Sequence, residues 1–413
     1  MKILRFVAGS VVVLSLVLSL GSTALAQSKE KNNLTPWRDP NNPKIILLDE
    51  GYDIPFVRRD RSKDPKREPG PINMQRYEYL LRKTEFPTYL GLPVAFTPED
   101  LKAGKVDVAI VGLPNDANPI PGAGWAANQM RFLRDYGTSN KGHDVYTNID
   151  YLKVLNAVDY GNSTVHWQGY IQMNWEEHAK IVGEILDAGA SFLAVGGDHS
   201  TTNGPLMALV DHYGPKSFMF VHFDAHHDLY QSSFGMFSHA GRARRWAYEQ
   251  GWLRGEDMVS IGLRGPYNPP EEVLAWQREV GERYHYMMEF ERDGFDTVWQ
   301  RILEETKGKR IFITFDVDVI DPAHAPGVSN STPGGFTAKE AMRMVREITI
   351  NADVLGISFE EYNPFMDDKH YNTALMVDSL MRSYLAGKAA RKKGITDPGY
   401  RTPEFLDHGH RKK

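Results

Sequence analysis

The chain has 413 residues, of which 41% are hydrophobic and 24% are charged, the composition of an ordinary soluble globular protein. Its formal net charge of −5 is small for this length and argues against a strong electrostatic attraction to nucleic acid or to an anionic membrane. Cysteine is absent, which excludes disulfides, thiolate metal sites and a cysteine nucleophile.

The first 26 residues have the pattern of a secretory signal peptide. Lys2 and Arg5 form a positive start, an apolar run covers residues 6–20, and Ala24-Leu25-Ala26 has the small-x-small form that signal peptidase requires. An uncleaved membrane anchor is the alternative, although the apolar run is short for a span of about 20 residues. We expect cleavage after Ala26, export to the periplasm or the exterior, and no stable membrane anchor.

Three further regions follow this segment. Residues 27–99 are dense in proline and charged side chains, and the prolines exclude long regular elements over much of the stretch. We interpret it as an N-terminal extension that wraps over the core or over a neighbouring subunit. The main domain is expected at residues 100–390. Residues 391–413 form a basic C-terminal tail, interpreted as a solvated terminal helix with a frayed end.

Short apolar runs alternate with amphipathic segments within the main domain. The apolar runs are rich in Val, Ile, Leu and Phe, as expected for strands of a parallel sheet that is covered on both faces. They span residues 106–113, 192–196, 217–224, 258–263, 310–316 and 354–359. Helical spacing of apolar residues covers residues 175–188, 270–280, 295–306 and 338–350. This alternation predicts a three-layer α/β/α fold with a central, mostly parallel sheet.

Acidic and histidine residues follow three of the predicted strands. These strands run into the segments Gly196-Gly197-Asp198-His199-Ser200, Asp224-Ala225-His226-His227-Asp228 and Asp316-Val317-Asp318. In an open parallel sheet, ligands bind at the carboxyl ends of the strands. Because side chains alternate along extended backbone, Asp224, His226 and Asp228 are expected to project to one side.

The three strand ends together offer two histidines and four carboxylates. Four neighbouring carboxylates are prohibitively unstable unless cations neutralise them, and two divalent ions about 3.5–4 Å apart would do so. Oxygen ligands with one imidazole per ion favour a hard, labile ion, Mn²⁺ first and Ni²⁺ as an alternative. A helix cap or a surface group would explain any one of these residues, but the whole set needs a common cause. The predicted metal ligands are His199, Asp224, His226, Asp228, Asp316 and Asp318.

These three segments resemble the metal signatures of the ureohydrolase family, which contains arginases, agmatinases and formiminoglutamases. The resemblance runs with gaps from about residue 106 to residue 386, includes Asp321-Pro322-Ala323, and is strongest toward agmatinases. It implies an arginase-like fold, a catalytic domain at residues 100–390, and a homo-oligomer, either a trimer or a hexamer. It also implies a hydroxide between the two ions as the nucleophile. The implied ligand sets are His199 and Asp228 for one ion and His226 and Asp318 for the other, with Asp224 and Asp316 bridging.

Two further positions complete the resemblance. Ser238-His239-Ala240-Gly241 falls where the family carries a His-Gly segment, which implies that His239 shuttles protons; a surface-loop histidine is the alternative. Glu361 in Glu361-Tyr362-Asn363-Pro364 resembles the family's glutamate that pairs with a guanidinium group. Glu360 would point the other way on extended backbone, so this assignment depends on the register. With Asp228, these two are the predicted catalytic residues.

The substrate-selecting positions depart from the familiar members. Tyr230 stands where arginases carry an Asn, and Gly265 where they carry an Asp that binds the α-amino group, which makes arginine an unfavourable substrate. An agmatinase arginine is replaced by Gly124, and the usual Gly-Thr-Gly-Thr-Pro loop by Gly327-Val328-Ser329-Asn330-Ser331. Aromatic side chains here could face a cation or could be plain core residues. The predicted substrate contacts are Trp125, Tyr230 and Asn330.

The resemblance implies hydrolysis of a small, agmatine-like guanidino compound to urea and an amine. Guanidinobutyrate, free guanidine or a formimino compound such as formiminoglutamate are alternative substrates, because the selecting loops are altered. A zinc deacetylase is a second class, although deacetylases normally use one zinc and fewer carboxylates. A non-catalytic binding protein on the same fold is the third, since fold alone does not establish function.

Overall fold

The computed structural model describes residues 67–74, 87–116, 128–136, 141–165, 171–229, 242–265 and 271–406, all within the compact unit Glu50–Lys413. The expected signal peptide, most of the expected N-terminal extension and the last seven residues of the expected tail lie outside these ranges. Among the described helices, none combines the length and the apolar character that crossing a membrane requires.

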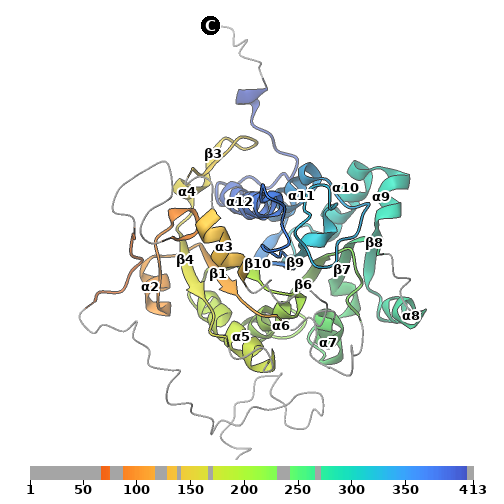
Figure 1. Cartoon of the computed structure of the whole chain (residues 1–413), viewed down its shortest axis with the longest axis horizontal. Helices are drawn as coiled ribbons and strands as arrows, with labels where there is room; N and C mark the ends of the chain where they lie inside the picture. Colours follow the sequence, from red (N-terminus) through yellow and green to blue (C-terminus); the bar gives the residue numbers. More distant parts are fainter. Residues whose placement is uncertain are drawn as a thin grey trace, which may run out of the picture. The chain divides into compact units, whose positions relative to one another are not determined.

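An eight-stranded sheet forms the centre of this unit, and every neighbouring pair of its strands is parallel. In order across the sheet, the strands are β4 (Ala157–Asn162), β1 (Val108–Leu113), β5 (Ser191–Gly196), β10 (Asp353–Glu360), β9 (Arg310–Asp316), β6 (Met219–Phe223), β7 (Met258–Leu263) and β8 (Arg283–Tyr286). Helices cover both faces of the sheet (Figure 1). The predicted three-layer α/β fold is confirmed.

Burial explains why these segments form strands. Every residue of β1, β5, β6 and β7 is buried, as the continuous apolar runs predicted for a sheet that is covered on both faces. The last strand in the chain, β10, lies between β5 and β9 and is in register with both, so that Ile357 pairs with Leu193 and with Ile313. The carboxyl ends of β5, β10, β9 and β6 therefore lie side by side at one edge of the sheet.

The helices form two layers. In Figure 1 the labels of α5, α6 and α7 lie on one side of the row of strands, and those of α3, α10, α11 and α12 on the other; α5 packs on α6 and α11 on α12. The helices are α2 (Pro98–Ala103), α3 (Gln129–Tyr136), α4 (Tyr151–Val154), α5 (Ile171–Asp187), α6 (Asn203–Tyr213), α7 (Ala243–Glu249), α8 (Glu271–Val280), α9 (Met287–Asp293), α10 (Phe295–Thr306), α11 (Ala338–Asn351) and α12 (Asn372–Lys392). A small antiparallel pair joins β2 (His143–Asp144) to β3 (Ile149–Asp150).

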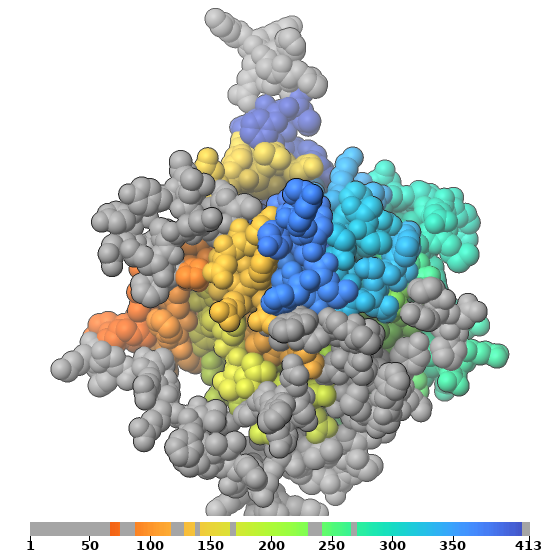
Figure 2. Space-filling view, in the orientation of Figure 1, coloured from red at the N-terminus to blue at the C-terminus, as the bar shows by residue number. Residues whose placement is uncertain are grey.

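The ends of the predicted regions differ from the observed elements. The boundary expected at residues 99 and 100 falls inside α2, which Thr97 and Asp100 cap reciprocally. The expected tail begins in the last turn of α12, a helix that is buried along most of its length and ends at Lys392. In the space-filling view, the blue surface of this C-terminal part lies between the orange-to-yellow segment that holds α3 and α4 and the cyan segment that holds α10 (Figure 2).

Candidate metal centre

The turn after β5 places His199 at the edge of the sheet. Asp198 caps the short 3₁₀ helix His199–Thr202, because its Oδ1 accepts hydrogen bonds from Ser200 N (3.1 Å) and Ser200 Oγ (2.6 Å). A Cβ atom on Gly197 would lie 1.6 Å from the carbonyl oxygen of Asn115, so only glycine permits this close approach of two backbones. His199 is thereby held in the interior, with 2% of its surface exposed.

A turn, rather than extended backbone, carries the segment after β6. The strand ends at Phe223, His226 N donates to Asp224 Oδ1 at 2.6 Å, and Asp228 adopts a left-handed conformation with φ of 48°. Asp224, His226 and Asp228 were expected to project to one side of extended backbone. The backbone is not a strand at these residues, although their side chains do reach the same cluster.

The end of β9 is tied to the end of β6. Asp316 Oδ1 accepts a hydrogen bond from Asp318 N at 2.8 Å, which begins the 3₁₀ turn Val317–Val319. Asp318 Oδ1 accepts another from Ala225 N at 3.0 Å, across the boundary between the two strand ends. Since β6 and β9 are neighbours in register, these bonds fix both acidic segments relative to each other.

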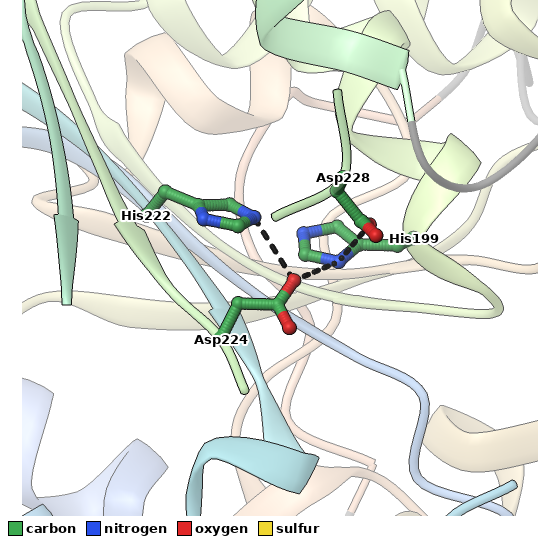
Figure 3. A group of neighbouring side chains, drawn as sticks. All are labelled: His199, His222, Asp224 and Asp228. Carbon is green, nitrogen blue, oxygen red and sulfur yellow. Dashed lines mark ion pairs between the residues drawn. The ribbon is translucent and has the colours of Figure 1, made fainter. Parts of the chain in front are cut away.

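All six predicted metal ligands lie together in the structure. His199 Nδ1 lies 3.1 Å from Asp224 Oδ2, 3.2 Å from Asp228 Oδ2 and 3.1 Å from Asp316 Oδ2. His226 Nδ1 lies 2.8 Å from Asp318 Oδ2 and 3.5 Å from Asp224 Oδ1. Asp224 thus presents one oxygen to each histidine, as a bridging carboxylate would. Figure 3 shows the group around His199, with Asp224 and Asp228 directed toward its ring.

The donor atoms of this cluster fit a cation. His199 Nδ1 and Asp224 Oδ2 are buried and make no hydrogen bond within the described residues, although oxygen and nitrogen atoms surround them. Burial, Asp318 and Asp224 raise the pKa of Asp316 well above its usual range. Burial lowers the pKa of His199, but the carboxylates around it outweigh burial and raise that pKa well above its ordinary value. A site that draws protons this strongly has an excess of negative charge, which divalent ions would neutralise.

His222 belongs to the same cluster and was missed in the sequence. Its Nε2 lies 3.0 Å from Asp224 Oδ2, and its ring stacks on His199 with centroids 5.1 Å apart (Figure 3). Burial and Arg244 lower the pKa of His222 to about 3, so the ring is neutral. Its position near the end of β6, two residues before Asp224, was the available signal, because residues two apart along extended backbone share a face.

Glu361 lies beside His199 because the backbone leaves the strand at this residue. Its φ of 65° is left-handed, its N–H donates to Gly197 O at 2.9 Å, and its Oε1 accepts from His199 N at 2.9 Å. The other oxygen, Oε2, is buried and makes no hydrogen bond within the described residues. Glu360 instead points into a buried group of hydroxyls. The register left open by the sequence thus places Glu361 beside the cluster.

The loop after β9 contacts the other histidine. Asn330 Nδ2 lies 3.1 Å, and Thr332 Oγ1 3.2 Å, from His226 Nε2, so Asn330 touches a predicted ligand on the side away from Asp318. Arg264 holds this loop by donating to the carbonyl oxygens of Asp318 and Thr332, both at 2.6 Å. Nothing in the sequence marked Arg264 for this role.

The comparisons with known proteins identify the family. The sequence profile of the Arginase family matches residues 106–387, more than half of the chain. This chain belongs to the arginase family. Members of this family are binuclear metal-dependent amidinohydrolases, which agrees with the His/Asp cluster at the sheet edge.

Individual members of the arginase family are similar at a moderate level. Proclavaminate amidinohydrolase from Streptomyces clavuligerus is 29% identical over 69% of this chain and 88% of its own length. Guanidinobutyrase from Pseudomonas aeruginosa is also 29% identical, over 72% of this chain and 91% of its own, and agmatinase from Salmonella newport is 29% identical over 74% and 94%. The solved structure of the Streptomyces amidinohydrolase superposes with a TM-score of 0.65 at 25% identity, covering 75% of this chain and 98% of that protein. These three relatives have different activities and the same identity to this chain. Together they establish the enzyme class but do not select a substrate.

The rest of the predicted arginase-family site lies outside the described residues. This holds for the substrate contacts Trp125 and Tyr230, for the replaced arginine position Gly124, and for the proton shuttle His239. The described part of the site therefore comprises the six carboxylate and imidazole ligand candidates, His222, Glu361 and the loop around Asn330.

Proposed function

We propose that this protein is a binuclear metal-dependent hydrolase that splits a small guanidino compound, of the agmatine type, into urea and an amine. The observation that carries the proposal is the pair of clusters that share Asp224, one around His199 and the other around His226. His199 and Asp228 would hold one ion and His226 and Asp318 the other, with Asp224 and Asp316 between them. Two divalent ions at this position supply positive charge and make hydroxide available near neutral pH. Mn²⁺ is the proposed ion, with Ni²⁺ as the alternative.

The protein's own groups account for binding and proton transfer. Glu361 Oε2 is buried and without a hydrogen bond in the described residues, so it can pair with a guanidinium N–H in a site that excludes water. Hydrolysis adds hydroxide to the guanidinium carbon and breaks one C–N bond. The added hydroxyl loses its proton as the urea carbonyl forms, and the departing amine gains that proton. We assign that proton transfer to His239, because imidazole titrates near neutral pH.

Substrate choice belongs to the same proposal. The relatives at 29% identity are named for proclavaminate, guanidinobutyrate and agmatine chemistry, and Gly265 follows Arg264 where arginases carry an acidic residue. We therefore favour a guanidino compound without an α-amino group. Agmatine is the first choice, and guanidinobutyrate, free guanidine and a formimino compound follow.

A product assay tests the function. The metal-free protein is loaded with Mn²⁺ or with Ni²⁺ and incubated with agmatine, guanidinobutyrate, guanidine and arginine, and urea is measured; formiminoglutamate is followed by release of formamide. We expect urea from agmatine or guanidinobutyrate, little from arginine, and loss of the activity in Asp228→Ala. A folded protein that carries two ions and releases no product from any compound would refute the proposal.

We also propose that the mature protein is exported and begins at Gln27. The positive start, apolar run and Ala24-Leu25-Ala26 of the sequence support this. Sequencing of the N-terminus after expression in a bacterial host, with separation of periplasm from cytoplasm, tests it. An intact Met1 in the cytoplasmic fraction would be the contrary result.

A further inference from the structure

Glu360, the last residue of β10, is a carboxylate in the interior of the protein. Its side chain is completely buried. Thr314 Oγ1 donates to Oε2 at 3.0 Å and Phe315 N at 3.3 Å, while Thr202 Oγ1 donates to Oε1 at 3.2 Å and Ser358 Oγ donates to the same oxygen. Burial raises the pKa of Glu360, whereas the hydrogen bonds from Ser358, Thr314 and Thr202 lower it. Four donors around one carboxylate favour its ionised form.

An ionised Glu360, with four donors directed at it, sets the direction of the neighbouring hydroxyl. A carboxylate only accepts hydrogen bonds, so the single proton of Thr314 Oγ1 points at Glu360. The same Thr314 oxygen lies 2.9 Å from His199 Nε2. With its proton committed to Glu360, Thr314 can only accept from His199, and Nε2 must carry a hydrogen.

This direction decides which nitrogen of His199 is free. A neutral imidazole with its proton on Nε2 has a lone pair on Nδ1. That Nδ1 is the atom which makes no hydrogen bond within the described residues and faces Asp224, Asp228 and Asp316. A metal-binding histidine generally has its other ring nitrogen fixed by an outer partner, often a carboxylate.

We infer that Glu360 is a positioning residue that holds His199, through the Thr314 hydroxyl, in the tautomer that can bind a metal ion. The inference rests on the proposed two-metal function. It applies to one half of the site only, because the ring of His226 meets Asn330 and Thr332 on its far side instead. Loss of Glu360 should therefore weaken one ion of the pair and spare the other.

The decisive variant is Glu360→Gln, which keeps the shape of the side chain and removes its charge. The new amide can donate to Thr314 and reverse its hydroxyl, so that His199 no longer needs a proton on Nε2. We expect one of the two Mn²⁺ ions to bind about 10–100-fold more weakly and the other to bind unchanged. Bound metal is counted at controlled free Mn²⁺, and electron paramagnetic resonance distinguishes a coupled pair of ions from a single ion.

Matched variants separate positioning from general damage. Thr314→Val should reproduce the selective loss, and Thr314→Ser, which keeps the hydroxyl, should restore it. Thr349→Val removes an equally buried hydroxyl that bonds only its own helix, and Glu347→Gln neutralises another buried glutamate; both should retain two tight ions. These measurements count bound metal and do not depend on catalysis. A protein that binds two ions but releases no urea would refute the proposed function, and the metal-binding test of Glu360 would still apply.

Two outcomes would overturn the inference. One is wild-type affinity for both ions in Glu360→Gln and Thr314→Val. The other is an equal loss of both ions in these variants, since that would mean a general disturbance of the site. If Glu360→Gln fails to fold, the comparison of Thr314→Val with Thr314→Ser decides the question alone.

Discussion

Arg244 Nη1 lies 2.8 Å from His222 Nδ1. A guanidinium only donates hydrogen bonds, so Nδ1 of His222 accepts and the ring proton resides on Nε2. Glu282 holds Arg244 in this position through a salt bridge of 2.9 Å. The Nε2 that faces Asp224 therefore carries a hydrogen and has no lone pair to offer an ion. His222 lies within the cluster but supports Asp224 and does not replace a ligand.

The first prediction concerns this distinction. His222→Ala should still bind two metal ions per chain, with affinity lowered about 10-fold, because an outer partner of a ligand is lost. Asp224→Ala should lose both ions, since Asp224 faces both histidines. Metal counting after dialysis at several free Mn²⁺ concentrations checks this. His285→Ala, at a buried histidine that pairs with Glu289, serves as the control. One ion missing from His222→Ala at saturating metal would make His222 a ligand after all.

The second prediction concerns Glu361. Glu361→Gln should lower kcat/KM for a guanidino substrate by about 100-fold or more, because the guanidinium loses its charged partner in a buried site. Both metal ions should remain bound, since Glu361 is no ligand candidate in the cluster. Steady-state urea release and metal content measure the two effects. In Glu347→Gln, where the carboxylate pairs with Arg343 and Arg401, we expect a lower Tm with kcat/KM unchanged. Equal kcat/KM in wild type and Glu361→Gln would show that Glu361 does not pair with the guanidinium group of the substrate.

Much of the fold could be predicted because its signals are local. The apolar runs marked β7 and β9 residue for residue, and helical spacing marked α10. The 21 residues of α12 were not predicted from the sequence. This helix is buried on most of its sides, so its sequence lacks the single apolar stripe by which an amphipathic helix is detected. The edge strand β8 was missed because its sequence, Arg-Tyr-His-Tyr, is polar and short.

Part of the candidate site could likewise be predicted from local sequence, and part could not. The six ligand candidates stood out because each lies at or just after the end of a strand, and parallel strands bring their carboxyl ends to one edge. The turn at Asp228 and the left-handed backbone at Glu361 could not be predicted, since non-glycine residues adopt positive φ only where tertiary contacts enforce it. The contacts of Arg264 with Asp318 and Thr332 span 54 and 68 positions in the chain and leave no local pattern.

The third prediction concerns Arg264, which bonds the loop at Thr332 to the strand end at Asp318. Arg264 donates through Nη2 to Asp318 O and Thr332 O, and through Nη1 to Val319 O. One ammonium nitrogen cannot occupy both positions, so Arg264→Lys should loosen the loop that contacts His226. We expect a stability loss of about 1–3 kcal/mol and weaker binding of one metal ion. Urea unfolding and metal titration measure both. Arg283→Lys is the control, because this guanidinium bonds Glu256 O and pairs with Glu305 and, within the described residues, makes no contact with the loop or the cluster. A wild-type metal affinity in Arg264→Lys would contradict the link between loop and site.

The fourth prediction concerns Lys388, on the last turns of α12. Its Nζ donates to Val354 O at 3.1 Å, and burial lowers its pKa to about 8, whereas Asp353 raises it and Arg391 lowers it further. Between that value and the ordinary lysine pKa of 10.5, the unfolded chain holds a proton that the folded chain has released. Stability of the wild type therefore rises with pH across this window.

Lys388→Met removes that titration. The free energy of unfolding of the variant should exceed that of the wild type most below pH 8, where the wild type carries a desolvated charge. This advantage should shrink by up to about 3 kcal/mol on approaching pH 10.5. Urea unfolding of both proteins at pH 7.5 and pH 10 measures the change. In Lys392→Met, where the lysine pairs with Asp107 at the surface, the difference from wild type should not follow this course. A stability difference for Lys388→Met that is constant with pH would show that the ammonium is hydrated in the folded chain.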